Sequence, residues 1–370
     1  MKIVHVVSNF SGAVGADRDS LSVLATATSR LGHAVTVVSM VSMASTADPG
    51  AGGLGAELRD ANVTVHELGA SDRVRAALKL VGLLARLRPD VVHVHADALP
   101  TAWIASRILS PLRGPRIVHT LDERALTAVS QAPRALRAAV WARAEQVAVS
   151  EAAAAGLERA FGARPRHIIP NAIPVAAYRM SEEDRASERA ALGLRRNQVA
   201  FLTVVGPDSA SAPGLILDAF ARPGMGPARL LIADAGALRR PLEVQARALD
   251  VLGRVDFLDD GAPLPHILGA VDALVVAAAS PCSVVKQAMA AGLPVIAAQN
   301  APWVSDATGL GFSAGDAAAL SAAMKRLAQD RTLGRRLGLA GATVALEQFD
   351  VRVVAQRYEA VYAAACGKIR

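Results

Sequence analysis

Short apolar runs alternate with longer alanine-rich stretches along the whole chain. In the first half, runs rich in β-branched residues occupy positions 3–7, 34–39, 63–68, 91–95, 116–120, 146–150 and 167–170. In the second half, similar runs occupy positions 199–206, 229–234, 255–259, 273–278 and 294–298. Strands that alternate with helices in this way are typical of parallel α/β sheets. The pattern therefore predicts a doubly wound α/β architecture.

The alternation pauses between residues 171 and 197, where the charged segment SEEDRASER replaces an apolar run. Pro170 and Pro174 bracket Asn171 at the start of this pause. Proline lacks a backbone donor and interrupts regular structure, which places a hinge at about 170–178. We therefore expect two domains, and a last helix at about 351–365.

Composition narrows the class of protein. The chain has 370 residues, 52% of them hydrophobic, which suffices for two sizeable cores and excludes a disordered or fibrous chain. Cys282 and Cys366 match neither a disulfide framework nor a CxxC motif, so we expect a reducing cytoplasm.

The start of the chain, MKIVHVVSNF, resembles a first strand rather than a signal peptide. The longest apolar run, 270–285, is interrupted and shorter than a spanning helix, which predicts a soluble or peripheral protein.

The chain is basic, with 40 Lys and Arg against 33 Asp and Glu, a net charge of +7. An acidic partner explains this excess, and so does the arginine-rich and alanine-rich composition of a GC-rich gene. Aromatic residues make up 4% of the chain and do not interleave with the arginines. Recognition of nucleic acid by base stacking is therefore not expected.

Residues that directly follow the strands are the first candidates for a binding site, because open parallel sheets bind ligands at the carboxyl ends of their strands. The first such turn, residues 8–19, contains Gly12 and Gly15. These glycines could let backbone amides approach a phosphate, or they could serve only the geometry of a tight turn.

A second candidate is the segment SPCSVVKQAMAAG at 280–292, which follows the apolar run at 273–278. Ser280 is a suitable N-cap, Pro281 suits the first helical position, and Gly292 with Pro294 marks the end. Free amides in the first turn of this helix could hold an anionic leaving group. The alternative is a well-capped helix that only packs against the sheet.

Seven pieces of sequence occur together in a recognisable order. They are the turn after the first strand, LGHAVTVVS at 31–39, RPDVVHVH at 88–95, AVSEAAAAGL at 148–157, IIPNAI at 168–173, QAMAAGLPVIA at 287–297 and the terminal FDVRVVAQRYEAVY at 349–362. With this order, the chain resembles the retaining family 4 glycosyltransferases of GT-B fold. The resemblance covers nearly the whole length.

The resemblance implies a GT-B architecture, with two Rossmann-like, doubly wound parallel-sheet domains that face each other across a cleft. Residues 1–172 would form the acceptor-type domain and residues 173–348 the donor-type domain, and residues 349–370 would pack back toward the first domain. It also implies transfer of a sugar from a nucleotide diphosphate sugar to a glycan or a lipid-linked acceptor. Such enzymes usually need no metal ion and no resident cofactor, and act in the cytoplasm or at the inner face of the cell membrane.

The chain departs from the family pattern where the chemistry is expected. The double glycine after the first strand is replaced by Gly15 and Ala16, and Asp122 stands at the position of the acceptor-side histidine. On the donor side, a Gly-Arg loop with a later lysine is replaced by the run from Gly206 to Ala212, and a Gly-Asp-Gly stretch by Asp234, Ala235 and Gly236. Two glutamates of the family are replaced by Ala279 and Gln287.

Two hypotheses follow from these replacements. In the first, a rebuilt donor site uses the amides of Ser283 and Val284 together with Lys286, and an arginine such as Arg239. Lys286 could equally be a solvated surface lysine. In the second, the chain is a pseudoenzyme that binds a partner glycosyltransferase, a glycan or a membrane intermediate. Loss of a single prearranged electrostatic group costs a rate factor of about 100 to 1000, which makes the second hypothesis serious.

Candidate site residues are thus assigned to two sides. Those on the donor side are Gly15, Gly206, Asp208, Ser211, Ser283, Val284, Lys286 and Gln287. Those on the acceptor side are Gly12, His95 and Asp122. No catalytic residue is assigned. His93, His95 and His119 suggest a metal site, but their spacing fits structural histidines better, and no metal site is expected.

Residues 73–88, RVRAALKLVGLLARLR, form a basic amphipathic pattern with Leu78, Val81, Leu84 and Leu87 on one stripe. Such a helix could rest on anionic lipid, which would give peripheral membrane contact. It could also pack its leucines on the sheet and leave its arginines in solvent, as every crossover helix in this architecture must bury one apolar face.

Overall fold

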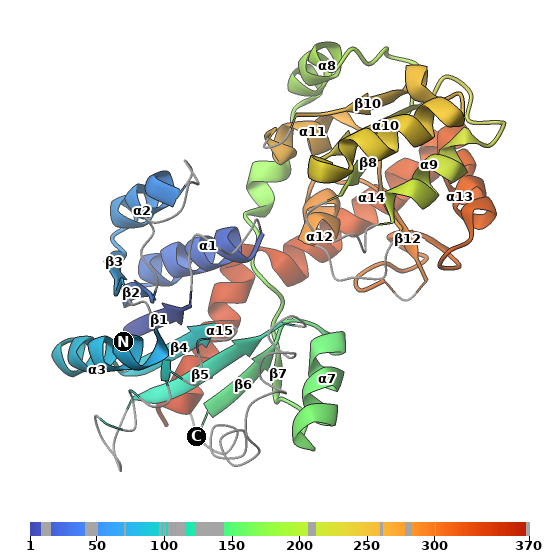
Figure 1. Ribbon diagram of the computed structural model, residues 1–370. Coiled ribbons are helices and arrows are strands. Elements are labelled where there is room, and N and C mark those ends of the chain that lie inside the picture. The colour runs from blue at the N-terminus through green and yellow to red at the C-terminus, as the bar shows by residue number, and fades with distance from the viewer. Residues whose placement is uncertain are drawn as a thin grey trace. The chain divides into compact units, whose positions relative to one another are not determined.

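The computed structural model describes most of the chain (Figure 1). The described residues are 1–8, 16–40, 51–69, 72–95, 98, 101, 102, 105, 108, 115–122, 144–205, 212–259, 262–277, 283–299 and 301–367. The chain forms two compact units. The first unit combines Met1–Ile173 with Val351–Arg370, and the second is Pro174–Asp350.

The first unit contains a seven-stranded parallel sheet with the order β3-β2-β1-β4-β5-β6-β7. Its strands are β1 (Lys2–Val7), β2 (Ala34–Ser39), β3 (Thr64–Glu67), β4 (Val91–His95), β5 (Arg116–Leu121), β6 (Ala144–Ala148) and β7 (His167–Ile168). Its helices are α1 (Ala16–Arg30), α2 (Ala51–Asp60), α3 (Arg73–Leu87), α7 (Glu151–Phe161) and α15 (Val351–Ala365). The order reverses between β1 and β4, as it does in doubly wound folds.

The second unit contains a six-stranded parallel sheet with the order β10-β9-β8-β11-β12-β13. Its strands are β8 (Ala200–Val204), β9 (Arg229–Ala233), β10 (Val255–Phe257), β11 (Ala273–Val276), β12 (Val295–Ala298) and β13 (Gly309–Phe312). Its α-helices are α8 (Glu182–Ala191), α9 (Pro213–Ala221), α10 (Arg239–Ala248), α11 (Leu264–Ala270), α12 (Ser283–Ala290), α13 (Ala317–Gln329) and α14 (Arg331–Val344). Short turns of 3₁₀-helix (Val175–Tyr178, Gly236–Leu238 and Leu252–Arg254) and one π-helix (Ala345–Phe349) complete it.

Two Rossmann-like parallel sheets confirm the predicted α/β fold class. Each of the twelve apolar runs overlaps a strand, β1 to β12 in order. Strand β13 was missed, because its sequence, GLGF, holds two glycines and lacks a β-branched residue. It forms by pairing in parallel with β12 at the edge of the sheet. Glycine is required at position 309, because a Cβ there would lie 2.2 Å from the Val295 carbonyl oxygen.

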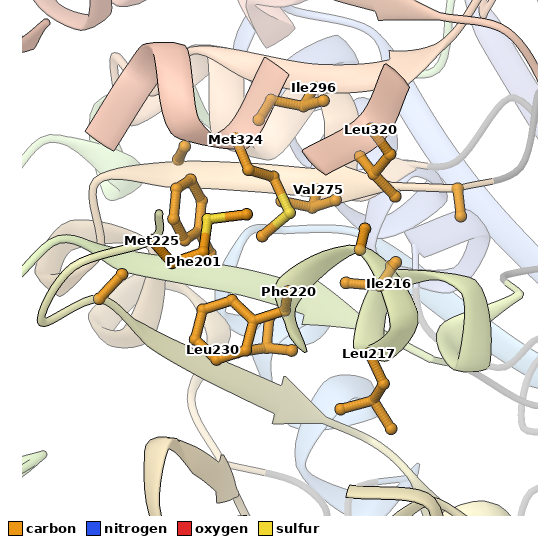
Figure 2. Packing of buried hydrophobic residues seen from close by; sticks show 14 of the residues in the cluster. Phe201, Ile216, Leu217, Phe220, Met225, Leu230, Val275, Ile296, Leu320 and Met324 are labelled. Atoms are coloured by element: carbon orange, nitrogen blue, oxygen red, sulfur yellow. The ribbon is translucent and has the colours of Figure 1, made fainter. Parts of the chain in front are cut away.

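The core of the second unit is built from the central strands and the helices that cover them (Figure 2). Phe201 on β8 and Phe220 on α9 are completely buried together with Ile216, Leu230 and Met324. The apolar runs of β8 and β11 are buried along nearly their whole length, as parallel strands covered on both faces must be. Truncation of one such phenylalanine to alanine costs about 3–5 kcal/mol.

Helix α15 completes the core of the first unit, although it is the last helix of the chain. Val354, Tyr358 and Tyr362 on this helix are buried against Ile3 of β1 and Val118 of β5. Figure 1 shows α15, in red, beside the sheet of the first unit. This packing makes the last helix part of the first unit rather than of the second, which directly precedes it.

Helix α3 buries a different stripe from the predicted one. Leu84 is buried as expected, whereas Leu78 is 62% exposed. The buried residues are Ala76, Ala77, Leu80, Leu83 and Leu84, with Val81 and Leu87 partly buried. The prediction was wrong for Leu78, because the helix is rotated so that Leu80 and Leu83 face the sheet. Val74, which is 70% exposed, lies one turn before Leu78 on the solvent side.

Candidate functional site

The candidate donor site lies at the carboxyl edge of the second sheet, where only part of the predicted set is described. Gly206, Asp208 and Ser211 after β8 lie outside the described residues, as do Pro207 and Ala279. The described residues at this edge are the turn from Asp234 to Gly236 after β9, Leu258 and Asp259 after β10, and the first turn of α12. Gly12 and Gly15 in the first unit are also outside the described residues.

Helix α12 carries four of the predicted donor-side residues. Ser283 is half-buried in its first turn, and Val284, Lys286 and Gln287 are buried. A helix that follows a parallel strand begins at the carboxyl edge of the sheet, so the first amides of α12 are presented there. The helix ends at Ala290, and Gly292 has a left-handed backbone with φ of 75°. This ending confirms the predicted stop signal.

Lys286 is not a solvated surface residue, since only 7% of it is exposed. Its Nζ lies 5.9 Å from the ring centroid of Phe349, which is completely buried, and Trp303 packs edge-on against the same ring at 5.0 Å. A buried ammonium over an aromatic face gains electrostatic attraction from the ring. The Lys286 amine therefore lies against an aromatic ring in the interior of the second unit. The alternative that Lys286 is a solvated surface lysine is wrong.

Arg239, the other candidate cation, is also engaged by groups of the protein. It opens α10 beyond β9, and its Nε lies 3.2 Å from Glu243 Oε1. Its Nη1 lies 3.8 Å from Asp259 Oδ1, and its guanidinium stands 5.8 Å from the ring centroid of Phe257. Two carboxylates thus already share the charge of this arginine.

Asp234 holds an unusual backbone conformation at the end of β9. Its φ is 52°, in the left-handed region that glycine favours and aspartate tolerates. The resemblance to family 4 glycosyltransferases places a glycine at this position. This backbone conformation is one that a glycine at the same position would also adopt readily. Gly236, two residues on, is also left-handed with φ of 47°.

In the first unit, His95 and Asp122 lie at the carboxyl ends of two neighbouring strands. His95 is the last residue of β4 and pairs in register with Thr120 of β5. Asp122 is half-buried and follows the last residue of β5 directly. The structure thus brings these two predicted acceptor-side residues to one edge of one sheet. His95 is already engaged, since its Nε2 lies 3.0 Å from Nδ1 of His5.

The three histidines that come together are His5, His93 and His95, and not the predicted set with His119. Strand register places His5 of β1 beside His93 of β4, and one ring nitrogen of each of the three lies within 4.8 Å of the others. His119 alternates to the other face of β5 and bonds Gln146 with its Nδ1 at 3.0 Å. Sequence reasoning missed His5, although the adjacency of first and fourth strands in a doubly wound sheet could have indicated it.

Most of the hydrogen-bonding capacity of this histidine cluster is already used. His93 contacts the Tyr362 hydroxyl through Nδ1 at 2.7 Å and the Thr120 hydroxyl through Nε2 at 2.8 Å. Burial lowers the pKa of His5 to about 3. Burial, together with the neighbouring histidines, also lowers the pKa values of His93 and His95 well below their ordinary range. Neutral imidazoles are suitable metal ligands, but a metal ion would have to displace these hydrogen bonds.

Two Rossmann-like parallel sheets in two separate units are the architecture of the GT-B fold. Two family models agree: residues 20–177 match Glycosyltransferase Family 4, and residues 196–330 match Glycosyl transferases group 1. The chain therefore has the GT-B fold, and each of its two halves matches a glycosyltransferase family model. No curated protein matches its sequence.

Solved structures of glycosyltransferases share the fold at low sequence identity. HepE of Anabaena in complex with UDP has 20% identity and a TM-score of 0.79, over 98% of this chain and 100% of that one. Sucrose-phosphate synthase of Thermosynechococcus elongatus has 19% identity and a TM-score of 0.78, over the whole of both chains. WaaG, a glycosyltransferase involved in lipopolysaccharide biosynthesis, has 14% identity and a TM-score of 0.68, over 97% and 99%.

Among the described residues, every helix is too short or too polar to cross a membrane.

Proposed function

We propose that this chain binds a nucleotide diphosphate sugar in its donor-type domain, residues 173–348, and transfers the sugar to a glycan or lipid-linked acceptor held by residues 1–172. The observation that carries the proposal is the position of α12, which follows β11 and has its first described turn, at Ser283 and Val284, at the carboxyl edge of the second sheet. The closing segment, residues 349–370, belongs with the acceptor-type domain in this assignment.

The chemistry of transfer explains why these amides matter. When the bond between the sugar and the diphosphate breaks, negative charge develops on the leaving phosphate. Backbone amides and the positive end of a helix stabilise that charge without any cationic side chain. In the first domain, Asp122 would hydrogen-bond the acceptor hydroxyl at the position that a histidine holds in the family. The standard retaining site is replaced, so the proposed transfer relies on α12 rather than on an Arg and Lys pair.

The substrate class is supported by the structural neighbours. HepE of Anabaena was crystallised with UDP, with UDP-glucose, and with UDP and glucose together. WaaG is involved in lipopolysaccharide biosynthesis. A nucleotide sugar as donor and a cell-envelope, polysaccharide or lipid acceptor are therefore the substrates we propose. A cytoplasmic location is part of this proposal.

A second candidate function is favoured by the state of the two remaining cations. Arg239 is shared between Glu243 and Asp259, and Lys286 is buried against Phe349. If neither can turn toward a diphosphate, donor binding falls, and the chain becomes a pseudoenzyme. Such a protein would act by binding a glycan or a partner glycosyltransferase.

Peripheral contact with the inner face of the membrane is a further part of the proposal. The exposed Val74 and Leu78 of α3 lie one turn apart, and Arg75 and Lys79 directly follow them in sequence. Apolar side chains flanked by cations are typical of helices that rest on anionic lipid. Binding to anionic vesicles, reduced in Val74→Asp with Leu78→Asp, tests this contact.

Titration with UDP and UDP-glucose separates the two functions. A nucleotide at 100 times its dissociation constant stabilises the folded state by about 2.7 kcal/mol, an easily measured shift. On the proposed function, UDP stabilises the protein, Ser283→Trp abolishes the effect, and UDP-glucose with an acceptor releases UDP. On the pseudoenzyme function, UDP gives no stabilisation below millimolar concentration.

Two sets of variants sharpen this test. Lys286→Met keeps the packing on Phe349 and removes the charge, so it weakens UDP binding only if the amine reaches the diphosphate. Lys325→Met on α13 is the matched control for removal of a lysine charge from a helix in the same unit.

The converse experiment restores the residues of the family pattern at the donor site. If the site is degenerate, restoring them together should recover nucleotide affinity. The restored variant combines Pro207→Arg, Ala212→Lys, Ala279→Glu and Gln287→Glu.

A further inference from the structure

A cavity of about 780 Å³ lies in the second unit at the edge where the strands of its sheet begin. Its lining includes Val199, Asp272 and Pro294, which immediately precede β8, β11 and β12. The first turn of α12 is at the opposite, carboxyl edge. Strands of four or five residues rise about 3.3 Å per residue, so roughly 15 Å of sheet separates the cavity from the proposed donor site.

The cavity is rich in arginine. Five arginines line it, namely Arg185, Arg189, Arg196, Arg331 and Arg335, against two carboxylates, Glu182 and Asp272. The lining therefore carries a net charge of +3, which is a large share of the +7 of the whole chain. A composition effect would spread the excess positive charge over the whole surface. Its concentration in one cavity instead favours the explanation that the cavity binds an anionic ligand.

Two of the five arginines are used to hold the fold. Arg185 and Arg189 both bind Asp272, with Nη2 to Oδ1 at 2.7 Å and Nη1 to Oδ2 at 3.1 Å. They also donate to backbone carbonyls at the end of α11, for example from Arg189 Nη1 to the Ala270 oxygen at 2.8 Å. Asp272 also accepts from the Ala200 amide at 2.8 Å. These groups form a saturated network that ties α8 and α11 to the sheet.

The other three arginines are available to a ligand. Arg331 and Arg335 stand one turn apart at the start of α14, and Arg196 lies in the loop before β8. All three are exposed, and among the described residues none of them has a carboxylate partner. Arg331 makes one contact, from Nη2 to the Asn197 carbonyl oxygen at 3.1 Å, which holds the loop of Arg196 beside α14. The N-terminus of α14 is capped by Asp330, whose Oδ1 accepts from the Leu333 amide at 2.9 Å, so the attraction for an anion comes from the arginine side chains.

Part of the lining, termed the floor, is apolar, and close packing fixes its shape. Val199, Leu293 and Leu327 contribute buried apolar surface to the lining. Helix α14 packs closely against Gly292, which lines the cavity, because Gly338 on α14 has no side chain. A Cβ on Gly338 would lie 1.9 Å from the Gly292 carbonyl oxygen. A ligand that suits this arrangement has a carbon body for the floor and a phosphate for the arginines.

We propose that this cavity binds an organic phosphate, with the phosphate held by Arg196, Arg331 and Arg335 and the apolar part of the molecule on the floor. Guanidinium groups offer forked pairs of donors that match phosphate oxygens, which favours phosphate over a simple halide or a single carboxylate. Because the cavity lies at the beginning of the strands, its ligand does not compete with a nucleotide sugar at the carboxyl edge. The site is independent of the proposed donor function.

Calorimetric titration of the full chain with phenyl phosphate, in a buffer free of phosphate and sulfate, tests the proposal. Phenyl phosphate should bind saturably, and Ser283→Trp, which blocks the proposed donor site, should leave this binding unchanged. The variant with Arg196→Gln, Arg331→Gln and Arg335→Gln should lose at least about tenfold in affinity, since three charge-assisted contacts are removed. Arg336→Gln, which removes an exposed arginine of the same helix outside the cavity, is the matched control and should bind as the parent does.

Sedimentation with vesicles identifies the source of the phosphate. Binding to equimolar phosphatidylcholine and phosphatidic acid, lost in the triple variant but not in Arg336→Gln, assigns the site to a lipid headgroup. Binding of phenyl phosphate without vesicle binding assigns it to a soluble organic phosphate. The proposal is overturned if the parent protein binds no phenyl phosphate and its vesicle binding is unchanged in the triple variant, if the triple variant binds phenyl phosphate as the parent does, or if Ser283→Trp abolishes this binding. The single variant Arg335→Gln, at an exposed position, repeats the test if the triple variant does not fold.

Discussion

His93 on β4 and Tyr362 on α15 are joined by a hydrogen bond of 2.7 Å between Nδ1 and the phenol oxygen, across 269 positions of sequence. Both side chains are completely buried. The chain of contacts continues from His93 Nε2 to the Thr120 hydroxyl, and from there to the Tyr358 hydroxyl at 2.8 Å. The last helix is therefore attached to the first sheet by a polar network as well as by apolar packing, and such networks specify one arrangement of a core.

Tyr362→Phe should destabilise the first unit by about 1–3 kcal/mol, because it leaves a buried nitrogen of His93 without this partner. Tyr358→Phe is the matched comparison and should cost less, about 0.5–1.5 kcal/mol, because Thr120 keeps its contact with His93. Hydrogen exchange of the β4 and β5 amides under native conditions measures both effects. Equal protection in the two variants would show that the bond to His93 contributes nothing beyond packing.

The stability of the first unit should fall with acid. The pKa of His5 is lowered to about 3, and the pKa values of His93 and His95 are lowered well below 6.5, so all three are neutral in the folded state at pH 6. The unfolded chain binds their protons below about pH 6.5, so acid favours unfolding. Each histidine then costs about 1.4 kcal/mol per pH unit, or about 4 kcal/mol for three.

Urea denaturation between pH 5 and pH 8, followed by hydrogen exchange of β1 and β4, measures this dependence. Stability should be level above about pH 7 and decline below about pH 6. His5→Gln removes one of the three groups and should reduce the slope by about a third. A slope that does not change in His5→Gln would contradict the assignment of the acid sensitivity to this cluster.

Arg189→Met should destabilise the second unit by about 1–3 kcal/mol, since it removes one of the two arginine partners of the half-buried Asp272 and the donor to three carbonyls. Arg189 bonds Asp272, Ala270, Arg195 and Gln198 in the native structure. The control is Arg195→Met, the same substitution at an exposed arginine in the loop after α8. It should cost less than about 0.5 kcal/mol. Chemical denaturation of the two variants gives the comparison, and similar midpoints would refute the role of the network.

Ala212→Gly should stabilise the second unit by about 0.5–1 kcal/mol. Ala212 is the N-cap of α9 and has a φ of 44°. This left-handed conformation is sterically unfavourable for a residue with a Cβ, whereas glycine adopts it without that cost. Ala219→Gly, in the interior of the same helix, should have the opposite sign and cost about 1 kcal/mol. Thermal unfolding of the pair decides the question, and a loss of stability in both variants would show that Ala212 is unstrained.

The sequence predicted the sheets well because parallel strands buried on both faces are apolar along their whole length, as β8 and β11 are. It failed at β13, where Gly309 allows a close approach to β12 but lowers the strand propensity of the segment. It also misplaced the face of α3, because a stripe at every third residue drifts around a helix whose true period is 3.6.

The site was less accessible to prediction than the fold. Strand order places His5 beside His93, but the spacing between the two in sequence is 88 residues and shows no motif. The burial of Lys286 depends on Phe349, a contact between α12 and a distant helical segment. The cavity at the start of the strands uses arginines from α8, α14 and a loop, and no local pattern links them. Such features arise from tertiary packing, and single-sequence patterns report mainly local structure.

The attachment of α15 to the first sheet has a consequence for synthesis on the ribosome. Residues Pro174–Asp350, an entire second unit, must be made before Val351 and the helix that follows can cover β4 and β5. At about 5–20 residues per second, those 177 residues take roughly 10 to 35 s. During that interval the nascent first unit exposes a face that bears His93, Thr120 and the apolar surface of Val118. The first domain to emerge is thus the last to be completed, and a chain stopped just before α15 would leave it open to chaperones and proteases.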